Sequence, residues 1–470
     1  MRFDLLVRGG TLVTEEAVYR ADLGVRDGRI AAQLDPEETP QADELIDGRR
    51  LYVLPGLVDA HVHFNEPGRT HWEGYETGSA AAAVGGVTTV LDMPLNSDPP
   101  TLNAGALAEK RRAVAGRSLV DYGHWGGLVT DNLADLDGLE RGGVVGYKAF
   151  MCDSGIAEFP AADDGVLLDG FERIGGWGNI LALHAENDAL VRRGAERLRS
   201  CDRRDPRAWA GARPPVVELE AVQRGLLLAR QSGGRAHFVH LSTAAAARAV
   251  ASARARGQAA TAETCPHYLA LDEDDLERLG AVAKCAPPLR TREEVEALWE
   301  CVLDGSITFV ASDHSPCSPE EKQRGGGDIW QSWGGISGVQ TSLAVMLTEG
   351  VHRRGLALTR LVSLLSANPA CLFGLYPRKG SLAPGADADL ALVDLEQEWT
   401  LRAGDLRTRH ELSPFLGRRF KGRVMATLVR GKLVARDGEP IGPPGHGQLL
   451  VPSRLGPHPR PQGCQAQRGG

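Results

Sequence analysis

Eight strand-length apolar runs, separated by stretches rich in alanine and leucine, constrain the fold of this chain more than any other feature. The runs cover residues 57–62, 87–92, 119–123, 144–150, 180–184, 236–240, 259–263 and 306–311. Strands that alternate with helices form parallel βαβ units. Eight such units predict an α/β fold, a closed (β/α)₈ barrel whose active site lies at the carboxyl ends of the strands.

The two ends of the chain have a different texture from the middle. Residues 1–54 and 378–440 contain short strand-like segments with turn signals such as Asp27-Gly28. We expect these parts to pair into one small composite β-sandwich domain, which accompanies a barrel over residues 55–377. Residues 441–470 are rich in proline and glycine and are predicted to be disordered.

Composition and charge exclude several classes of protein. The 470 residues carry a formal net charge of −8 with a sequence pI near 5.9, whereas a nucleic-acid surface would usually be basic. No run of about 18 apolar residues is present, so we expect no membrane partner. The eight cysteines include no CxxC pair, which predicts reduced thiols. The first residues contain no apolar signal core, so we expect a cytoplasmic protein.

Four histidines and one aspartate stand at the predicted strand ends. His61 and His63 end the first run, and residues two apart on a strand face the same side. His184 closes the fifth run, His240 closes the sixth, and Asp313 follows the eighth. An isolated His-x-His pair would be weak evidence, but this many ligand-type side chains at one end of a barrel predict a divalent metal site.

Lys148 lies inside the apolar fourth run. A buried ammonium beside metal ions would suffer desolvation and like-charge repulsion, and both lower its pKa toward the neutral amine. A neutral amine can add CO₂, and the resulting carbamate is an anion whose two oxygens can bridge two metals. We therefore predict an N6-carboxylated Lys148; the alternative is a lysine that extends to solvent.

Together these side chains predict a two-metal hydrolase. The ligand types favour zinc, although they also suit iron, cobalt or manganese. A hydroxide held between two metals is a strong nucleophile at neutral pH. Asp313 is the candidate catalytic residue, because it can take the proton of that hydroxide and pass it to the leaving nitrogen.

Over residues 1–435 the sequence resembles the cyclic-amidohydrolase branch of the amidohydrolase superfamily. The resemblance implies one metal bound by His61, His63 and Asp313. It implies a second metal bound by His184 and His240, with carboxylated Lys148 bridging both. It also implies a small-molecule substrate, a β-domain split between the termini and a homo-oligomer, commonly a tetramer.

Three groups of enzymes within that branch compete. Dihydroorotases carry an arginine where this chain has Asn65, and an asparagine cannot form a charged bidentate clamp on a carboxylate. Hydantoinases and dihydropyrimidinases carry a tyrosine and a serine where this chain has Asp153 and Ala286. Several segments resemble allantoinases instead: residues 65–70, 72–74, 92–97, 154–160, 263–268, 284–288 and 312–317.

The expected reaction is therefore hydrolysis of the hydantoin ring of allantoin to allantoate, a step of purine degradation. A hydantoinase-type or dihydropyrimidinase-type cyclic amidase is the alternative. A non-catalytic structural relative is a third hypothesis, but such a protein would lack metal ligands that are intact here.

Candidate substrate contacts near the site are Asn96, Ser315 and Cys285. Each has a structural alternative: Asn96 could cap a helix, Ser315 could be a turn residue before a proline, and Cys285 could be a small packing residue. Residues 323–335 include three consecutive glycines, which is typical of either a lid or a flexible surface loop.

Overall fold

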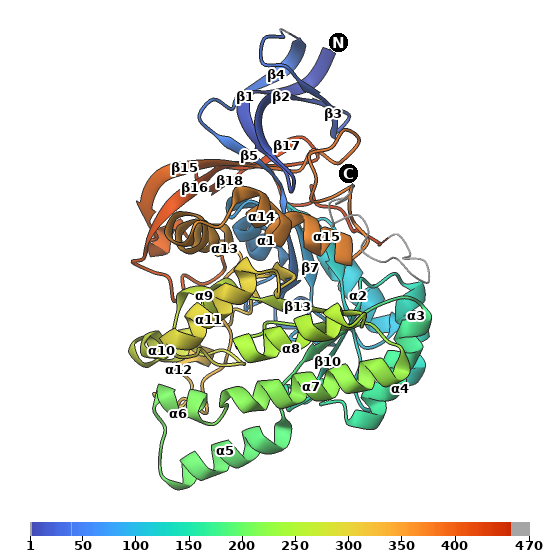
Figure 1. Cartoon of the computed structure of the whole chain (residues 1–470), viewed down its shortest axis with the longest axis vertical. Helices are drawn as coiled ribbons and strands as arrows, with labels where there is room; N and C mark the ends of the chain where they lie inside the picture. The colour runs from blue at the N-terminus through green and yellow to red at the C-terminus, as the bar shows by residue number, and fades with distance from the viewer. Residues whose placement is uncertain (1, 39, 453–470) are drawn as a thin grey trace.

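The computed structural model describes residues 2–38 and 40–452, and its centre is built from short parallel strands (Figure 1). One sheet has three strands in the order β6-β7-β8, and another has six in the order β14-β13-β12-β11-β10-β9. Their bounds are β6 (Leu57–Val62), β7 (Val87–Asp92), β8 (Asp121–His124), β9 (Gly126–Gly127), β10 (Tyr147–Phe150), β11 (Leu181–His184), β12 (Ala236–Phe238), β13 (Ala260–Thr264) and β14 (Phe309–Val310).

Helices follow these strands along the chain, and α4, α7, α8 and α11 lie side by side over them (Figure 1). Several begin at a side chain that accepts a backbone N–H, as Asp163 does for α4 and Thr243 for α8. The helices as far as α11 are α1 (Tyr75–Val84), α2 (Ala104–Val114), η1 (Leu133–Asp135), α3 (Leu136–Arg141), α4 (Asp164–Gly176), α5 (Asp188–Ser200), α6 (Pro206–Gly211), α7 (Pro215–Ser232), α8 (Ala244–Ala255), α9 (Pro266–Ala270), α10 (Glu273–Leu279), η2 (Gly280–Ala283) and α11 (Arg292–Leu303).

The remaining helices follow β14. They are α12 (Pro319–Gln323), α13 (Ser342–Val345), the π-helix η3 (Met346–His352), α14 (Leu358–Val362), the π-helix η4 (Ser363–Ala367), α15 (Asn368–Leu372) and the 3₁₀-helix η5 (Ala403–Asp405). In the part of the chain that the structure describes, no helix combines the length and the apolarity needed to cross a bilayer.

Strands from both ends of the chain share a nine-stranded sheet, in the order β18-β17-β16-β15-β5-β1-β2-β3, with β4 beside β1. The ends meet where β5 pairs parallel to β1 and antiparallel to β15. Its strands are β1 (Arg2–Val13), β2 (Val18–Arg26), β3 (Arg29–Leu34), β4 (Gln41–Asp47), β5 (Tyr52–Pro55), β15 (Leu390–Thr400), β16 (Arg419–Val429), β17 (Lys432–Arg436) and β18 (Glu439–Pro440).

Local sequence signals in this sheet act in two different ways. Asp27 and Gly28 both have positive φ, 51° and 72°, and they form the two-residue turn between β2 and β3. Gly9, at φ 73°, lies within β1, where the pairing with β2 shifts register. The strand therefore continues through this glycine as a bulge.

Each of the eight predicted apolar runs overlaps a strand, and the start of the predicted disordered tail contacts the parallel strands. Leu449 forms a parallel bridge with Tyr122 of β8, and Leu450 is 1% exposed. Within residues 441–452, the apolar pair Leu449-Leu450 therefore packs against the parallel strands. Leu449 pairs with the free edge of β8, and Leu450 is buried in the core. Residues 453–470 lie outside the described residues.

Candidate metal centre

The predicted ligands all lie at the carboxyl ends of the parallel strands. Lys148 and His184 belong to β10 and β11, which are paired neighbours in the six-stranded sheet. The remaining ligands stand at or just beyond β6, β12 and β14: His61, His63, His240 and Asp313. Because parallel strands point the same way, one edge of the sheets collects side chains that are far apart in sequence.

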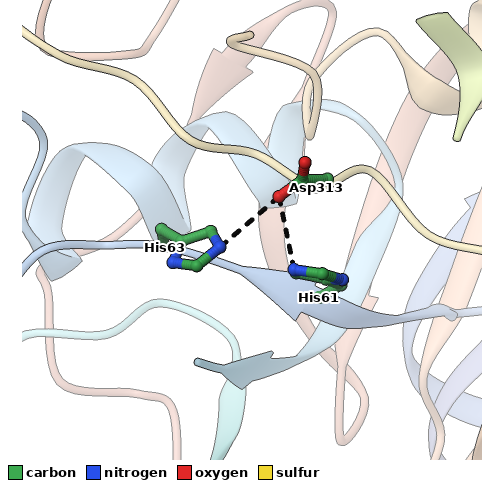
Figure 2. A group of neighbouring side chains, drawn as sticks. All are labelled: His61, His63 and Asp313. Atoms are coloured by element: carbon green, nitrogen blue, oxygen red, sulfur yellow. Dashed lines mark ion pairs between the residues drawn. The ribbon is translucent and has the colours of Figure 1, made fainter. Parts of the chain in front are cut away.

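Asp313 lies between the two histidines that end β6 (Figure 2). Its Oδ1 atom is 3.3 Å from Nε2 of His61 and 3.4 Å from Nε2 of His63. A backbone hydrogen bond of 2.7 Å from His63 to the carbonyl of His314 fixes the two segments relative to each other. All three side chains are buried, and their ligand atoms lie within 4.8 Å of one another.

His184 and His240 form a second group beside the first. Nδ1 of His184 faces Nε2 of His240 at 3.0 Å. The ring of His240 is also 5.4 Å from the ring of His61, measured between centroids, so the two groups adjoin. Phe150 stacks on the ring of His184 at 4.4 Å with an interplanar angle of 11°, and this contact fixes the plane of the imidazole.

Lys148 is 1% exposed, and its Nζ atom has no hydrogen-bond partner among the described residues. Burial lowers the pKa of Lys148 from its ordinary 10.5 to about 8, although the negative charges of Glu263 and Asp313 act to raise this pKa. Nζ lies 5.2 Å from the centroid of the Phe150 ring. An unsatisfied buried amine of lowered pKa is the species that adds CO₂, so the geometry fits the predicted carboxylation.

The charge states of the other ligands also suit a cation. Burial lowers the pKa of His61, His184 and His240, so these imidazoles are neutral and keep a lone pair. Burial alone would raise the pKa of Asp313, but the charges of His61 and His63 and a hydrogen bond from His63 lower it below its usual value. An anionic carboxylate therefore faces the imidazoles of His61 and His63.

The spacing of the donor atoms provides a further test of the fit. Two ligands about 2.0–2.1 Å from one tetrahedral ion lie about 3.3–3.4 Å apart. The two distances from Asp313 to His61 and His63 match this value, and the 3.0 Å between His184 and His240 is slightly shorter. The residues present thus fit divalent ions at both groups.

Two buried glutamates behind the histidines were not among the predicted site residues. Glu263 Oε1 is 2.5 Å from Nδ1 of His61, and Glu186 Oε2 is 2.8 Å from Nε2 of His184. Partners hold the pKa of each carboxyl at about 2 although burial opposes this: His61 and His237 for Glu263, and Arg213 and His184 for Glu186. Their positions, one ending a predicted strand and one two residues after a ligand, were the available signal.

The three candidate substrate contacts have different surroundings in the structure. Ser315 Oγ donates to the carbonyl of Asp313 at 3.0 Å. Asn96 has φ 70° and does not cap a helix, since the N-cap of α2 is Asn103. Cys285 is 2% exposed, and burial raises the pKa of its thiol to about 12. Contact with substrate stays a prediction for all three.

Two buried lysines hold the glycine-rich segment over residues 323–335. Lys284 Nζ donates to the carbonyl of Ile329 at 2.7 Å and to that of Ser332. Lys322 Nζ donates to the carbonyls of Trp333 and Gly335, the latter at 2.6 Å. In this conformation four carbonyls of the glycine-rich segment accept hydrogen bonds from the two lysines. Whether the segment acts as a lid or as a surface loop stays a prediction.

A further buried acidic group already contains its own cation. The carboxylates of Asp121, Asp387 and Asp389 surround Lys379, whose Nζ lies 2.5, 2.9 and 2.7 Å from them, respectively. Arg430 also pairs with Asp121. This cluster joins β8 to the segment before β15 and is a structural link between the parallel strands and the nine-stranded sheet.

The chain belongs to the amidohydrolase family, whose pattern it matches over residues 52–136 and 218–434. It is 48% identical over 456 residues to an allantoinase from Rubrobacter xylanophilus, covering 96% of this chain and 98% of that one. It is 49% identical over 455 residues to an allantoinase from Deinococcus radiodurans, covering 97% and 100%.

Among solved structures, the fold is similar to the L-hydantoinase (dihydropyrimidinase) from Arthrobacter aurescens. The TM-score is 0.93 at 36% sequence identity, covering 96% of this chain and 100% of that one. The dihydropyrimidinase from Brevibacillus agri has a TM-score of 0.89 at 30% identity, covering 96% and 99%.

Proposed function

We propose that this protein hydrolyses the hydantoin ring of allantoin to allantoate, as a step of purine degradation. The observation that carries the proposal is the convergence of six ligand-type side chains, none of them missing, at the carboxyl ends of the parallel strands: His61, His63, Lys148, His184, His240 and Asp313. Full-length similarity to two allantoinases at 48% and 49% identity supports the choice of substrate.

The proposed cofactor is a pair of divalent ions, zinc in first place, with iron, cobalt or manganese as alternatives. His61, His63 and Asp313 would hold one ion, His184 and His240 the other, and carboxylated Lys148 would bridge them. When bound, such ions polarise a carbonyl and lower the pKa of a nearby water.

Asp313 is the proposed proton carrier. Its carboxylate is buried and anionic, and its Oδ1 atom lies 3.3 Å from Nε2 of His61 and 3.4 Å from Nε2 of His63, so it is placed where it could accept a proton. A water that becomes the nucleophile releases its first proton to solvent. Asp313 would take the remaining proton of the hydroxide and deliver it to the ring nitrogen as the C–N bond breaks, so the products are a carboxylate and a free ureido group.

Two alternatives have different support. The similarity in fold to a hydantoinase favours a hydantoinase-type cyclic amidase as the second candidate. Against it, the positions of the expected tyrosine and serine hold Asp153 and Ala286. A non-catalytic relative is disfavoured by the intact ligand set.

The finer features of the fold belong to the same proposal: a closed (β/α)₈ barrel over 55–377 and a small composite β-domain from 1–54 and 378–440. Closure is supported by the parallel bridge between Val62, at the end of β6, and His314, just after β14. It is also supported by β8 and β9, which Trp125 alone separates. A homotetramer in the cytoplasm is the proposed assembly and location.

The test uses the purified full-length protein with its metals. We expect allantoin to be converted to allantoate, a chelator to stop the conversion, and zinc with bicarbonate to restore it. A preparation that contains two ions per chain yet forms no allantoate would refute the proposed activity and leave the metal site standing.

A further inference from the structure

We propose that Glu263 and Glu186 are positioning residues that fix opposite imidazole tautomers on His61 and His184. Each carboxylate would thereby decide which ring nitrogen of its histidine is free to bind metal. The inference rests on the proposed two-metal site, and it deepens that proposal by assigning a role to two glutamates that are not among the proposed ligands.

Glu263 acts on His61 from the side opposite to Asp313. Its Oε1 atom is 2.5 Å from Nδ1 of His61, while Nε2 of the same ring lies 3.3 Å from Asp313. A carboxylate offers only acceptors, so Nδ1 of His61 must carry the proton. The lone pair of this neutral ring is then on Nε2, which is the nitrogen that faces the first ligand group.

Glu186 imposes the reverse arrangement on His184. Its Oε2 atom is 2.8 Å from Nε2, and Nδ1 faces His240 at 3.0 Å. By the same reasoning, the proton is on Nε2 and the lone pair is on Nδ1. The stacked ring of Phe150 limits rotation of this imidazole, so the ring cannot readily exchange its two nitrogens.

Contacts besides those with the ligand imidazoles hold both glutamates in place. Glu263 Oε2 is 3.1 Å from Nε2 of His237, and Nδ1 of His237 is 2.9 Å from Oγ1 of Thr261. The backbone N–H of His240 also donates to Glu263 Oε1 at 3.3 Å. One carboxylate thus contacts a side chain of the first ligand group and the backbone of the second.

Glu186 has a cation as its second partner. Its Oε1 atom is 3.4 Å from Nε of Arg213, whose guanidinium lies 3.7 Å from the centroid of the Trp209 ring. Both glutamates are 0% exposed, so no water competes for their oxygens. Groups that orient ligands in this way typically change metal affinity by about 10–100-fold when they are removed.

The experiment compares Glu263→Gln with Glu186→Gln in the full-length chain. A glutamine keeps the size of the side chain but presents one donor and one acceptor, so it no longer enforces a single tautomer. Glu218→Gln is the matched control, because Glu218 is also 0% exposed and accepts hydrogen bonds from Ser242 and Thr243 without contacting a proposed ligand.

Metal-free protein is titrated with Co²⁺ in bicarbonate buffer while the visible spectrum follows the two binding steps. We expect Glu263→Gln to weaken one step by about 10–100-fold and Glu186→Gln to weaken the other. The control should weaken neither step. If both substitutions weakened the same step, or neither changed any, the proposal would be overturned.

A second measurement needs no variant and no metal. In the metal-free wild type labelled with ¹⁵N-histidine, His61 should carry its proton on Nδ1 and His184 on Nε2. The same tautomer on both rings would overturn the inference whatever the substrate. Conversely, opposite tautomers together with no allantoin hydrolysis would contradict the proposed function alone.

Discussion

Asp313 Oδ1 lies 3.3 Å from Nε2 of His61. Asp313 follows β14, which is the last of the parallel strands in sequence, and His61 lies near the end of β6, which is the first. The carboxylate therefore faces a proposed ligand nitrogen, and Glu263 contacts the other nitrogen of the same ring. The proposed function gives Asp313 two roles, which are to hold an ion with one oxygen and to transfer a proton.

Replacing Asp313 by asparagine separates these roles. An amide oxygen can still bind a metal weakly, but it cannot accept a proton at neutral pH. We expect kcat for allantoin to fall by about 10²–10⁴-fold, the usual contribution of general acid–base catalysis, with most of the metal retained. Steady-state kinetics and metal analysis on the same sample check this. Near-normal turnover with a full metal complement would place the base elsewhere.

Lys148→Ala removes the proposed bridge between the ions. Metal content and activity should fall together, with activity lower by about 10³-fold or more, because metal polarisation contributes several kcal/mol. Short carboxylic acids in solution should restore part of the activity by supplying the missing anion. Lys284→Met, which also removes a buried amine, should keep its metal. Two ions and normal turnover in Lys148→Ala would contradict the carbamate.

The sequence predicts the strands and the ligands for the same reason. Apolar runs such as 57–62 must be buried, and a histidine or aspartate at the end of such a run is costly to bury unless it binds a partner. The parallel arrangement then brings His61, His184 and Asp313 together without further information. Local sequence patterns and one topological rule were sufficient for this part of the site.

The residues that sequence reasoning missed depend on contacts between elements distant in the chain. Glu263 contacts His61 only because β13 and β6 end at the same place. The sequence shows His237 only as a residue within a strand, and its role depends on its contact with Glu263. The sequence also did not predict the lysine contacts of the segment over residues 323–335. Its three glycines indicate backbone freedom, whereas the lysines that bind it, Lys284 and Lys322, lie outside it.

Lys284 makes stability depend on pH in a defined direction. Burial lowers its pKa to about 7, with Arg213 and Lys322 adding to the effect, while an unfolded lysine titrates near about 10.4. Between these values the unfolded chain binds one more proton at this residue, so its contribution makes the free energy of unfolding rise with pH, by up to about 1.4 kcal/mol per unit.

Lys284→Met lacks this contribution. The urea midpoint of the wild type, relative to that of the variant, should therefore rise from pH 7 to pH 10. Denaturation curves of metal-loaded protein at three pH values measure it. A difference that stayed constant or changed in the opposite direction would show that Lys284 keeps an ordinary pKa in the folded chain.

The measurement that tests the central claim most directly is kcat/KM across four cyclic amides: allantoin, hydantoin, dihydrouracil and dihydroorotate. Asn65 provides no cation for the carboxylate of dihydroorotate, and an unpaired buried charge is costly. Asp153 and Ala286 replace the tyrosine and serine expected around a dihydropyrimidine ring.

We predict that allantoin is the best substrate by a factor of about 100 or more, equivalent to about 2.7 kcal/mol in transition-state binding. A hundredfold preference for hydantoin or dihydrouracil would contradict the assignment while leaving the two-metal site intact.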